Sequence, residues 1–298
     1  QGKATDTLVL SQLFHADLVA EDSAKLNAGE VLPRNLWGRH SLKSWGIRMG
    51  TMKGDYDGGW EELNDDMLVY CKQDVTVTYL LYKKLMVDGQ IFSQRSIDLE
   101  HSMAEVCDRI GNNGWTFDTE AAGALYADLA QKRSDLEREL AVLFEPWEVH
   151  TEFLPKRDNK TLGYVKDEPF TKVKVVEFNP SSRKHIQYCL QKKYGWKPKE
   201  FTNSGDAKVD EAVLSKLEYP EAKKLAMMFL LTKRIAALAE GNQAWLKLCG
   251  LDGKLRHRII PGGTVSGRAS HRSPNLAQVP STRSAYGREC RDLFTAPK

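Results

Sequence analysis

The sequence has few cysteines and no long apolar run, and each shortage excludes a class of protein. Its five cysteines are an odd number and lie far apart, so they predict neither a disulfide framework nor a CxxC metal site, and we expect reduced, mostly buried thiols. The longest apolar run, 225–231, is far shorter than the roughly 20 residues of a membrane-spanning helix. The residues after Gln1 do not show the charged and then apolar pattern of a secretory leader, so we expect a fragment or processed piece rather than a secreted precursor. We also expect a reducing cytoplasmic location and no membrane-spanning segment.

Charge is distributed unevenly along the 298 residues, although the net charge is only +3. Residues 1–100 carry 11 Lys+Arg against 15 Asp+Glu, whereas residues 251–298 carry nine against three, and seven of those nine are arginine. An arginine-rich segment of this kind is typical of a phosphate-binding surface, and a solvated face is an equally good interpretation of charge alone.

Helical patterns account for most of the chain. Asn64 followed by two acids predicts a helix from Asp65 to about Met86, ended by Gly89. The run at residues 5–20 could be a buried strand or the start of a helix. Further helices are predicted over 97–110, over about 25 residues from Asp118 to a stop at Pro146, after Pro180, over 210–217, and over 221–248, and the polar stretch after Pro146 is interpreted as a long loop or a hairpin.

Tyr70 and Asp74 stand four residues apart on the first of these helices, so both project from one face. A carboxylate can hold a divalent metal while a phenol one turn away orients water or a phosphate, which suits metal-assisted hydrolysis of a phosphodiester. An isolated YxxxD pair is a weak signal, however, and an exposed Asp beside a half-buried Tyr is the commoner explanation.

The C-terminal segment offers a second chemistry. A basic run at 256–258 precedes a Gly-rich turn, an SGRAS loop and a PNLAQVP stretch, in which Asn275 and Gln278 are side-chain donors. Donors in a DNA minor groove meet purine N3 and pyrimidine O2, acceptors that every base pair presents, so they test pairing geometry rather than sequence. A copying enzyme requires this property, although a Gly-rich connector with solvated arginines is the alternative.

Five stretches, in this order, resemble the family A DNA polymerases, most closely the replicative polymerases of short-tailed phages that recruit host thioredoxin. They are DTLVLSQLFH, HSLKSWGIRMGTMKGDY, YCKQDVTVTYLLYKKL, FNPSSRKHIQ and VSGRASHRSPNLAQVPSTRSAYGRECRDLF, from Asp6 to Phe294. The resemblance implies a DNA-directed DNA polymerase, a nucleotidyltransferase with 3′–5′ proofreading exonuclease activity. It also implies Mg²⁺ as cofactor, primer–template DNA and deoxynucleoside triphosphates as partners, and phage DNA replication in the cytoplasm of an infected bacterium.

The resemblance also implies a fold class, α/β plus mostly α. Residues 1–95 would be the C-terminal half of a ribonuclease H-like 3′–5′ exonuclease domain, residues 96–250 a helical thumb with an insertion loop at 147–172, and residues 251–298 the start of an α+β palm. Since the family's other catalytic carboxylates fall outside these stretches, the isolated fragment is expected to be inactive. A separate DNA-binding thumb subunit of a split polymerase and a stand-alone 3′–5′ exonuclease are the alternatives.

Individual roles follow from the same resemblance. Tyr70 and Asp74 match the third exonuclease motif, with Asp74 as a metal ligand. The expected DNA contacts are Lys197, Lys199, Thr202 and Ser204 at the thumb tip, Lys233 and Arg234 on the following helix, Arg268 in a TGR-like motif in which Ser266 replaces the usual Thr, and Asn275 and Gln278 along the primer–template.

The segment 147–172 lies where the resembled phage polymerases insert their thioredoxin-docking loops. It is only 26 residues long and carries five basic and five acidic side chains. A balanced charge gives little net attraction toward DNA or an acidic partner. We therefore expect host thioredoxin to bind weakly or not at all, and the segment to form a hairpin that touches DNA at most marginally.

Overall fold

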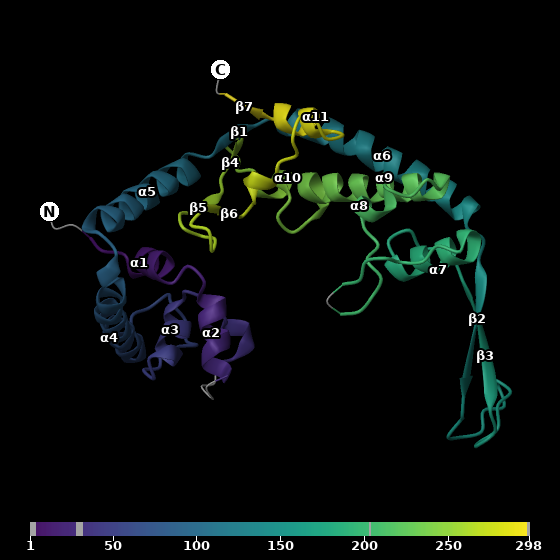
Figure 1. Ribbon diagram of the computed structural model, residues 1–298, viewed down its shortest axis with the longest axis horizontal. Coiled ribbons are helices and arrows are strands. Elements are labelled where there is room, and N and C mark those ends of the chain that lie inside the picture. The colour runs from purple at the N-terminus through teal and green to yellow at the C-terminus, as the bar shows by residue number, and fades with distance from the viewer. Residues whose placement is uncertain (1–3, 28–31, 203, 297–298) are drawn as a thin grey trace. The chain divides into compact units, whose positions relative to one another are not determined.

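The computed structural model describes residues 4–27, 32–202 and 204–296 (Figure 1). It is a mixed α/β structure dominated by helices. The chain divides into two compact units, which are described separately: unit 1 consists of residues 1–117 and 248–298, and unit 2 of residues 118–247. This division follows contacts within the chain, and the functional division at residues 95 and 250 stays a prediction.

Unit 1 begins with a helix, which decides the ambiguity at residues 5–20. Asp6 starts α1 (Thr7–Phe14) because its carboxylate accepts hydrogen bonds from the N–H groups of Leu8 and Val9. Ser41 caps α3 in the same way. The remaining elements of this part are α2 (Leu18–Asn27), η1 (Arg34–Leu36) and α3 (Leu42–Arg48), and its core consists of Leu10, Leu18, Trp45, Leu81 and Leu85.

The long helix α4 (Asp65–Asp88) confirms the prediction made from its capping residues. The Asn64 side chain accepts a hydrogen bond from the Met67 N–H, and Gly89 follows the last turn. A short turn, η2 (Gly89–Ile91), leads to α5 (Gln94–Asn113), which is longer at both ends than the predicted 97–110. Four apolar side chains of α5 that share one face are exposed in this structure: Leu99, Met103, Val106 and Ile110.

Short strands tie the two chain segments of unit 1 together. β1 (Trp115–Phe117) pairs antiparallel with both β4 (Lys254–Leu255) and β7 (Phe294–Thr295). A separate hairpin is formed by β5 (Arg258–Ile260) and β6 (Ser270–Arg272), and η4 (Leu276–Gln278) and α11 (Gly287–Asp292) follow it. Gly111 allows α5 to approach β5 closely, because a Cβ at this position would lie 2.4 Å from the His257 carbonyl oxygen.

Unit 2 is built on α6 (Thr119–Leu143), whose 25 residues and Asp118 cap confirm the prediction. It packs against α9 (Pro220–Ile235). Ser182 caps α7 (Arg183–Tyr194), and Asp210 caps the single turn α8 (Glu211–Leu214), which is shorter than the predicted 210–217. The centre of this core contains fully buried aliphatic side chains: Leu140, Ile186, Leu190, Leu214 and Leu225.

The predicted helix over 221–248 is wrong in its extent. α9 ends at Ile235, a π-helical turn η3 (Ala236–Glu240) follows, and only then does α10 (Trp245–Leu248) begin. The helix breaks at Gly241, where the backbone is extended (φ −66°, ψ 162°). Gly241 has no room for a side chain, because a Cβ there would lie 2.6 Å from the Ala236 carbonyl oxygen. The apolar spacing on both sides of Gly241 concealed this interruption.

The polar stretch after Pro146 is a hairpin of β2 (Trp147–Phe153) and β3 (Phe170–Val176), paired in register over seven residue pairs. Its far end is ordered by a small aromatic cluster, in which the Tyr164 ring lies 5.3 Å from Phe153 and 5.4 Å from Phe170. Asn159 pairs with Tyr164 across the turn. Of the two predicted structures, loop or hairpin, the hairpin is therefore correct.

Candidate functional site

The structure places Tyr70 and Asp74 on α4 together with a third residue, Lys53. The Lys53 ammonium donates to Asp74 Oδ2 at 2.9 Å and lies 4.8 Å from the centre of the Tyr70 ring. Tyr70, and more weakly Asp74, raise the pKa of Lys53 against the opposing effect of burial. The three side chains therefore form one charged cluster, with the lysine cationic at neutral pH.

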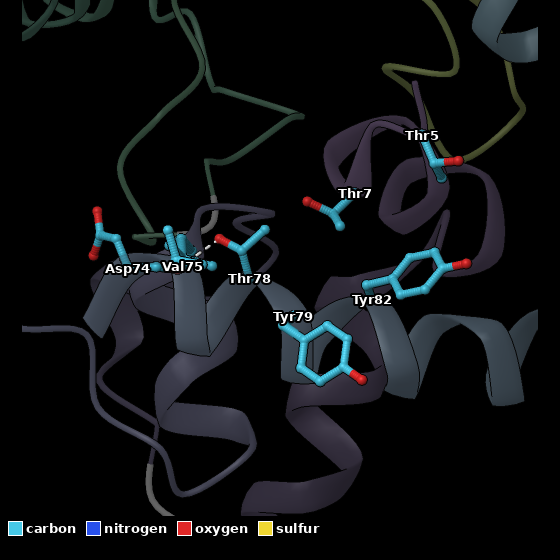
Figure 2. A pocket seen from close by; sticks show the side chains of 8 residues that line it. Thr5, Thr7, Asp74, Val75, Thr78, Tyr79 and Tyr82 are labelled. Carbon is cyan, nitrogen blue, oxygen red and sulfur yellow. Dashed lines mark hydrogen bonds between the residues drawn. The ribbon is translucent and has the colours of Figure 1, made fainter. Parts of the chain in front are cut away.

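Two hollows flank this cluster in unit 1. One, of about 510 Å³, is lined by Asp74, Thr78, Tyr79 and Tyr82 of α4 together with Thr5 and Thr7. Figure 2 shows Asp74 at one end and Tyr79 and Tyr82 farther along the helix. The other, of about 670 Å³, is lined by Tyr70 and the loop before α4. The cluster thus borders space that can receive a ligand on either side of α4.

Asp74 has the character of a single metal ligand, but its surroundings do not make a metal site. Its Oδ1 atom is buried and has no hydrogen-bond partner among the described residues, so a cation could bind it. However, no group of three or more His, Cys, Asp or Glu residues in the described part of the chain could hold a metal ion. The other oxygen, Oδ2, is already paired with the Lys53 ammonium. The donor set present therefore does not fit a Mg²⁺ centre by itself.

Lys53 and two aromatic residues that contact Tyr70, Tyr56 and Trp60, were missed by sequence reasoning. The rings of Tyr56, Trp60 and Tyr70 contact one another at centroid distances of 4.9–5.9 Å, and Trp60 is 59% exposed. The Tyr56 hydroxyl donates to the Gly59 carbonyl oxygen and accepts from Asn64. Lys53, Tyr56 and Trp60 lie in the loop before α4, where no periodicity marks which side chains will converge on a helix.

The loop that carries Arg268 has a fixed backbone and a free side chain. Thr264 Oγ1 accepts from the Arg268 N–H at 3.0 Å and donates to the Arg268 carbonyl oxygen at 3.1 Å. Gly267 lies between them with φ +75°, a conformation that glycine adopts readily. Since Arg268 is itself exposed, its guanidinium is presented at the end of the β5–β6 hairpin.

The other predicted DNA contacts in unit 1 are exposed as well: Asn275 and Gln278 bracket the turn η4. Arg291 behaves differently, because its guanidinium donates to the carbonyl oxygens of Pro280 and Val279 and so fastens this segment to α11. Polar side chains of the PNLAQVP stretch therefore face solvent on a backbone that is held in place.

Unit 2 contains the remaining predicted contacts. Lys197 and Lys199 are exposed, and beyond them the hydroxyls of Thr202 and Ser204 hydrogen-bond each other at 2.8 Å within a tight turn. On α9 the two predicted residues differ: Lys233 is exposed, whereas Arg234 is only 8% exposed and interacts within the protein. The structure thus assigns the predicted DNA contacts to two units, and the role of each stays a prediction.

The fold is that of a known class of enzymes. The chain is similar to the POL domain of Pol1 from M. smegmatis, solved in complex with DNA primer-template and dNTP: the TM-score is 0.63 at 15% sequence identity, over 98% of this chain and 41% of that one. This likeness establishes a polymerase-domain fold. Within the described residues no helix is long and apolar enough to cross a membrane.

Sequence comparison gives the family. Residues 154–298 match the sequence model of DNA polymerase family A. The chain is 36% identical to the DNA-directed DNA polymerase of Enterobacteria phage T3 and 35% identical to that of Escherichia phage T7, in each case over 98% of this chain and 52% of the relative. The family model and the two phage relatives together support a family A DNA polymerase close to the T7-like phage enzymes, and the chain spans about half the length of the phage polymerases that it matches.

Proposed function

We propose that this chain is part of a phage DNA-directed DNA polymerase and contributes its primer–template contacts. The observation that carries the proposal is 36% identity to a phage DNA-directed DNA polymerase over 98% of the chain. The surface chemistry supports it, because Arg268, Asn275 and Gln278 are exposed on a backbone held by internal hydrogen bonds. Arginine and side-chain amides are suitable donors to minor-groove acceptors.

The finer assignments of the family are part of the same proposal. Residues 1–95 would belong to a 3′–5′ exonuclease with Asp74 as one ligand of a divalent cation, and residues 96–250 would form the thumb that follows duplex phosphates. The buried, unpartnered Asp74 Oδ1 supports the first assignment, and the exposed Lys197 and Lys199 support the second. Deoxynucleoside triphosphates, a host-cytoplasmic location and weak thioredoxin binding are carried over as predictions.

Binding of primer–template DNA to the 298-residue chain tests the proposal. Arg268→Ala should weaken binding about tenfold or more, because a hydrogen bond from a charged group contributes roughly 1.5–3 kcal/mol. Arg288→Ala is the matched control, since it removes the same charge from the same unit at a side chain that is 82% exposed, and it should change the affinity little. Fluorescence anisotropy with a labelled primer–template gives both values, and equal affinities for the two variants would remove Arg268 from the site.

A further inference from the structure

The register of the β2–β3 hairpin sorts its charged side chains onto opposite faces. Directly paired residues of antiparallel strands lie on the same face, and successive residues alternate. Lys174 is paired with Val149 and Lys172 with Thr151, so both lysines share the face that also carries Trp147. We call this the basic face; it contains no carboxylate of either strand.

The acidic residues of β2 occupy the other face. Glu148 is paired with Val175 and Glu152 with Thr171, and His150 between them lies 3.2 Å from the Glu148 carboxylate. The balance of charge counted along the sequence therefore conceals a separation of charge in space. A partner that approached the basic face would meet two lysines and would not meet the glutamates of the strands.

The basic face continues onto helix α7 at the base of the hairpin, where Figure 1 shows α7 next to the start of β2. The Trp147 ring stacks on Tyr188 at 4.7 Å, and the Lys192 ammonium lies 5.9 Å from the centre of the Tyr188 ring. Lys184 precedes Tyr188 by one helical turn and so lies on the same stripe. Lys174 is a diagonal neighbour of Trp147 on the hairpin, at roughly 7–8 Å.

These side chains are exposed and available for an external anion. Lys172, Lys174, Lys184 and Lys192 are all exposed, and none of them forms an ion pair with another described residue. The neighbouring Lys193, in contrast, is paired with Glu221 at 2.6 Å. One carboxylate that borders this surface is that of Glu145, which lines the same hollow as Lys192.

We propose that the basic face of the hairpin and the Lys184–Tyr188–Lys192 stripe of α7 form one nucleic-acid-binding surface that contacts the phosphate backbone. This inference rests on the proposed function, because it requires a DNA-binding chain. Lys172 and Lys174 are about 7 Å apart along the strand, at ~3.4 Å per residue, a spacing that allows each to meet a different phosphate. The hairpin thus contacts DNA through one face, contrary to the marginal role expected from its net charge.

An acidic protein segment is the competing partner for such a surface, and two features favour nucleic acid. The four lysines are distributed over two elements, Lys172 and Lys174 on β3 and Lys184 and Lys192 on α7, as suits an extended polyanion. Tyr188, 38% exposed between them, offers an aromatic face next to the lysines, a combination typical of nucleic-acid surfaces. The binding experiment below distinguishes nucleic acid from an acidic protein segment.

The test is the salt dependence of duplex binding by the whole 298-residue chain. Each phosphate neutralised contributes roughly −0.9 to the slope of log affinity against log salt concentration, so K172A/K174A should reduce the magnitude of that slope by about 1.8. The double variant K156A/K160A removes the same charge from the turn of the same hairpin and should leave the slope within error. Fluorescence anisotropy with a labelled DNA duplex, between 50 and 200 mM NaCl, gives the three slopes.

Three outcomes would overturn the inference, and they differ in whether the proposed function is also contradicted. If the parent chain binds duplex and R268A weakens primer–template binding, but K172A/K174A leaves the slope unchanged, the basic face is not a DNA surface and the proposed function stands. If K172A/K174A weakens binding of poly-glutamate but not of DNA, the partner is an acidic protein. If the parent chain binds no DNA at any salt concentration, the inference and the proposed function both fail.

Discussion

Replacing Asp22 with alanine is expected to lower the free energy of unfolding of unit 1 by about 3–5 kcal/mol, the usual cost of leaving one partner of a buried ion pair alone. The Asp22 and Arg48 side chains are only 1% and 2% exposed. Both carboxylate oxygens accept from the Arg48 guanidinium at 2.8 Å, and the Gly38 N–H donates to the same carboxylate. Without Asp22, the Arg48 charge would be buried with no compensating anion.

A matched control distinguishes burial from charge pairing. Asp252→Ala breaks a similar pair with Arg256 in the same unit, but both side chains are about half exposed, so the expected loss is roughly 0–1 kcal/mol. Urea unfolding of the two variants, with amide hydrogen exchange in α1 and α3 to identify the transition of unit 1, measures both effects. Equal losses would show that the Asp22 pair is not the buried link described above.

Unit 1 is also expected to lose about 3 kcal/mol of stability between pH 6.5 and pH 4, because His40 is held neutral. Burial is the main cause that lowers the pKa of His40 from 6.5 to about 4, and electrostatic interactions with Arg48 and His15 lower it further. As pH falls below 6.5 the unfolded chain takes up the proton before the folded one does, so stability is complete above pH 6.5 and is lost down to about pH 4, at ~1.4 kcal/mol per pH unit. Burial of His257, with His271 beside it, lowers the pKa of His257 and acts in the same direction.

The pH dependence can be assigned to His40 by substitution. His40 Nδ1 and the Ser11 hydroxyl form a hydrogen bond of 2.7 Å, and the Trp45 indole donates to that same hydroxyl. His40→Asn keeps an acceptor near the position of Nδ1 and cannot be protonated, so its unfolding free energy should change less between pH 7 and pH 4.5 than that of the parent. His150→Asn, at an exposed site on the hairpin, should retain the parental profile. A profile of His40→Asn identical to the parent's would contradict the assignment.

Local sequence signals predicted the helices of this protein well where a cap and a stop were both present. Asn64 and Gly89 bound α4, and Asp118 begins α6, as expected. The extent of the predicted 221–248 helix failed at Gly241, where backbone crowding from Ala236 decides the geometry. Apolar spacing reports which residues share a face, but it does not report a close backbone approach.

The candidate site was predictable only in part, because its geometry depends on residues far apart in the chain. Tyr70 and Asp74 were found from their spacing on one helix, whereas Lys53 reaches Asp74 from a loop 21 positions earlier. Similarly, counting charges in 147–172 predicted little net attraction toward DNA, and only the strand register revealed that Lys172 and Glu152 lie on opposite faces. The spacing of residues within one helix or strand can be read from the sequence, whereas the sequence does not show which separate elements bring their side chains together.

The central claim, that this chain is a DNA-binding part of a family A polymerase, is tested most directly by its affinity for a labelled primer–template as the salt concentration rises. With several exposed lysines and Arg268 contributing, at roughly 0.9 for each phosphate neutralised, the log–log slope should be steeply negative between 50 and 200 mM NaCl. The affinity should also vary little with base sequence, because phosphates and minor-groove acceptors are common to all sequences. An affinity that does not change with salt, or no binding at 50 mM, would contradict the account.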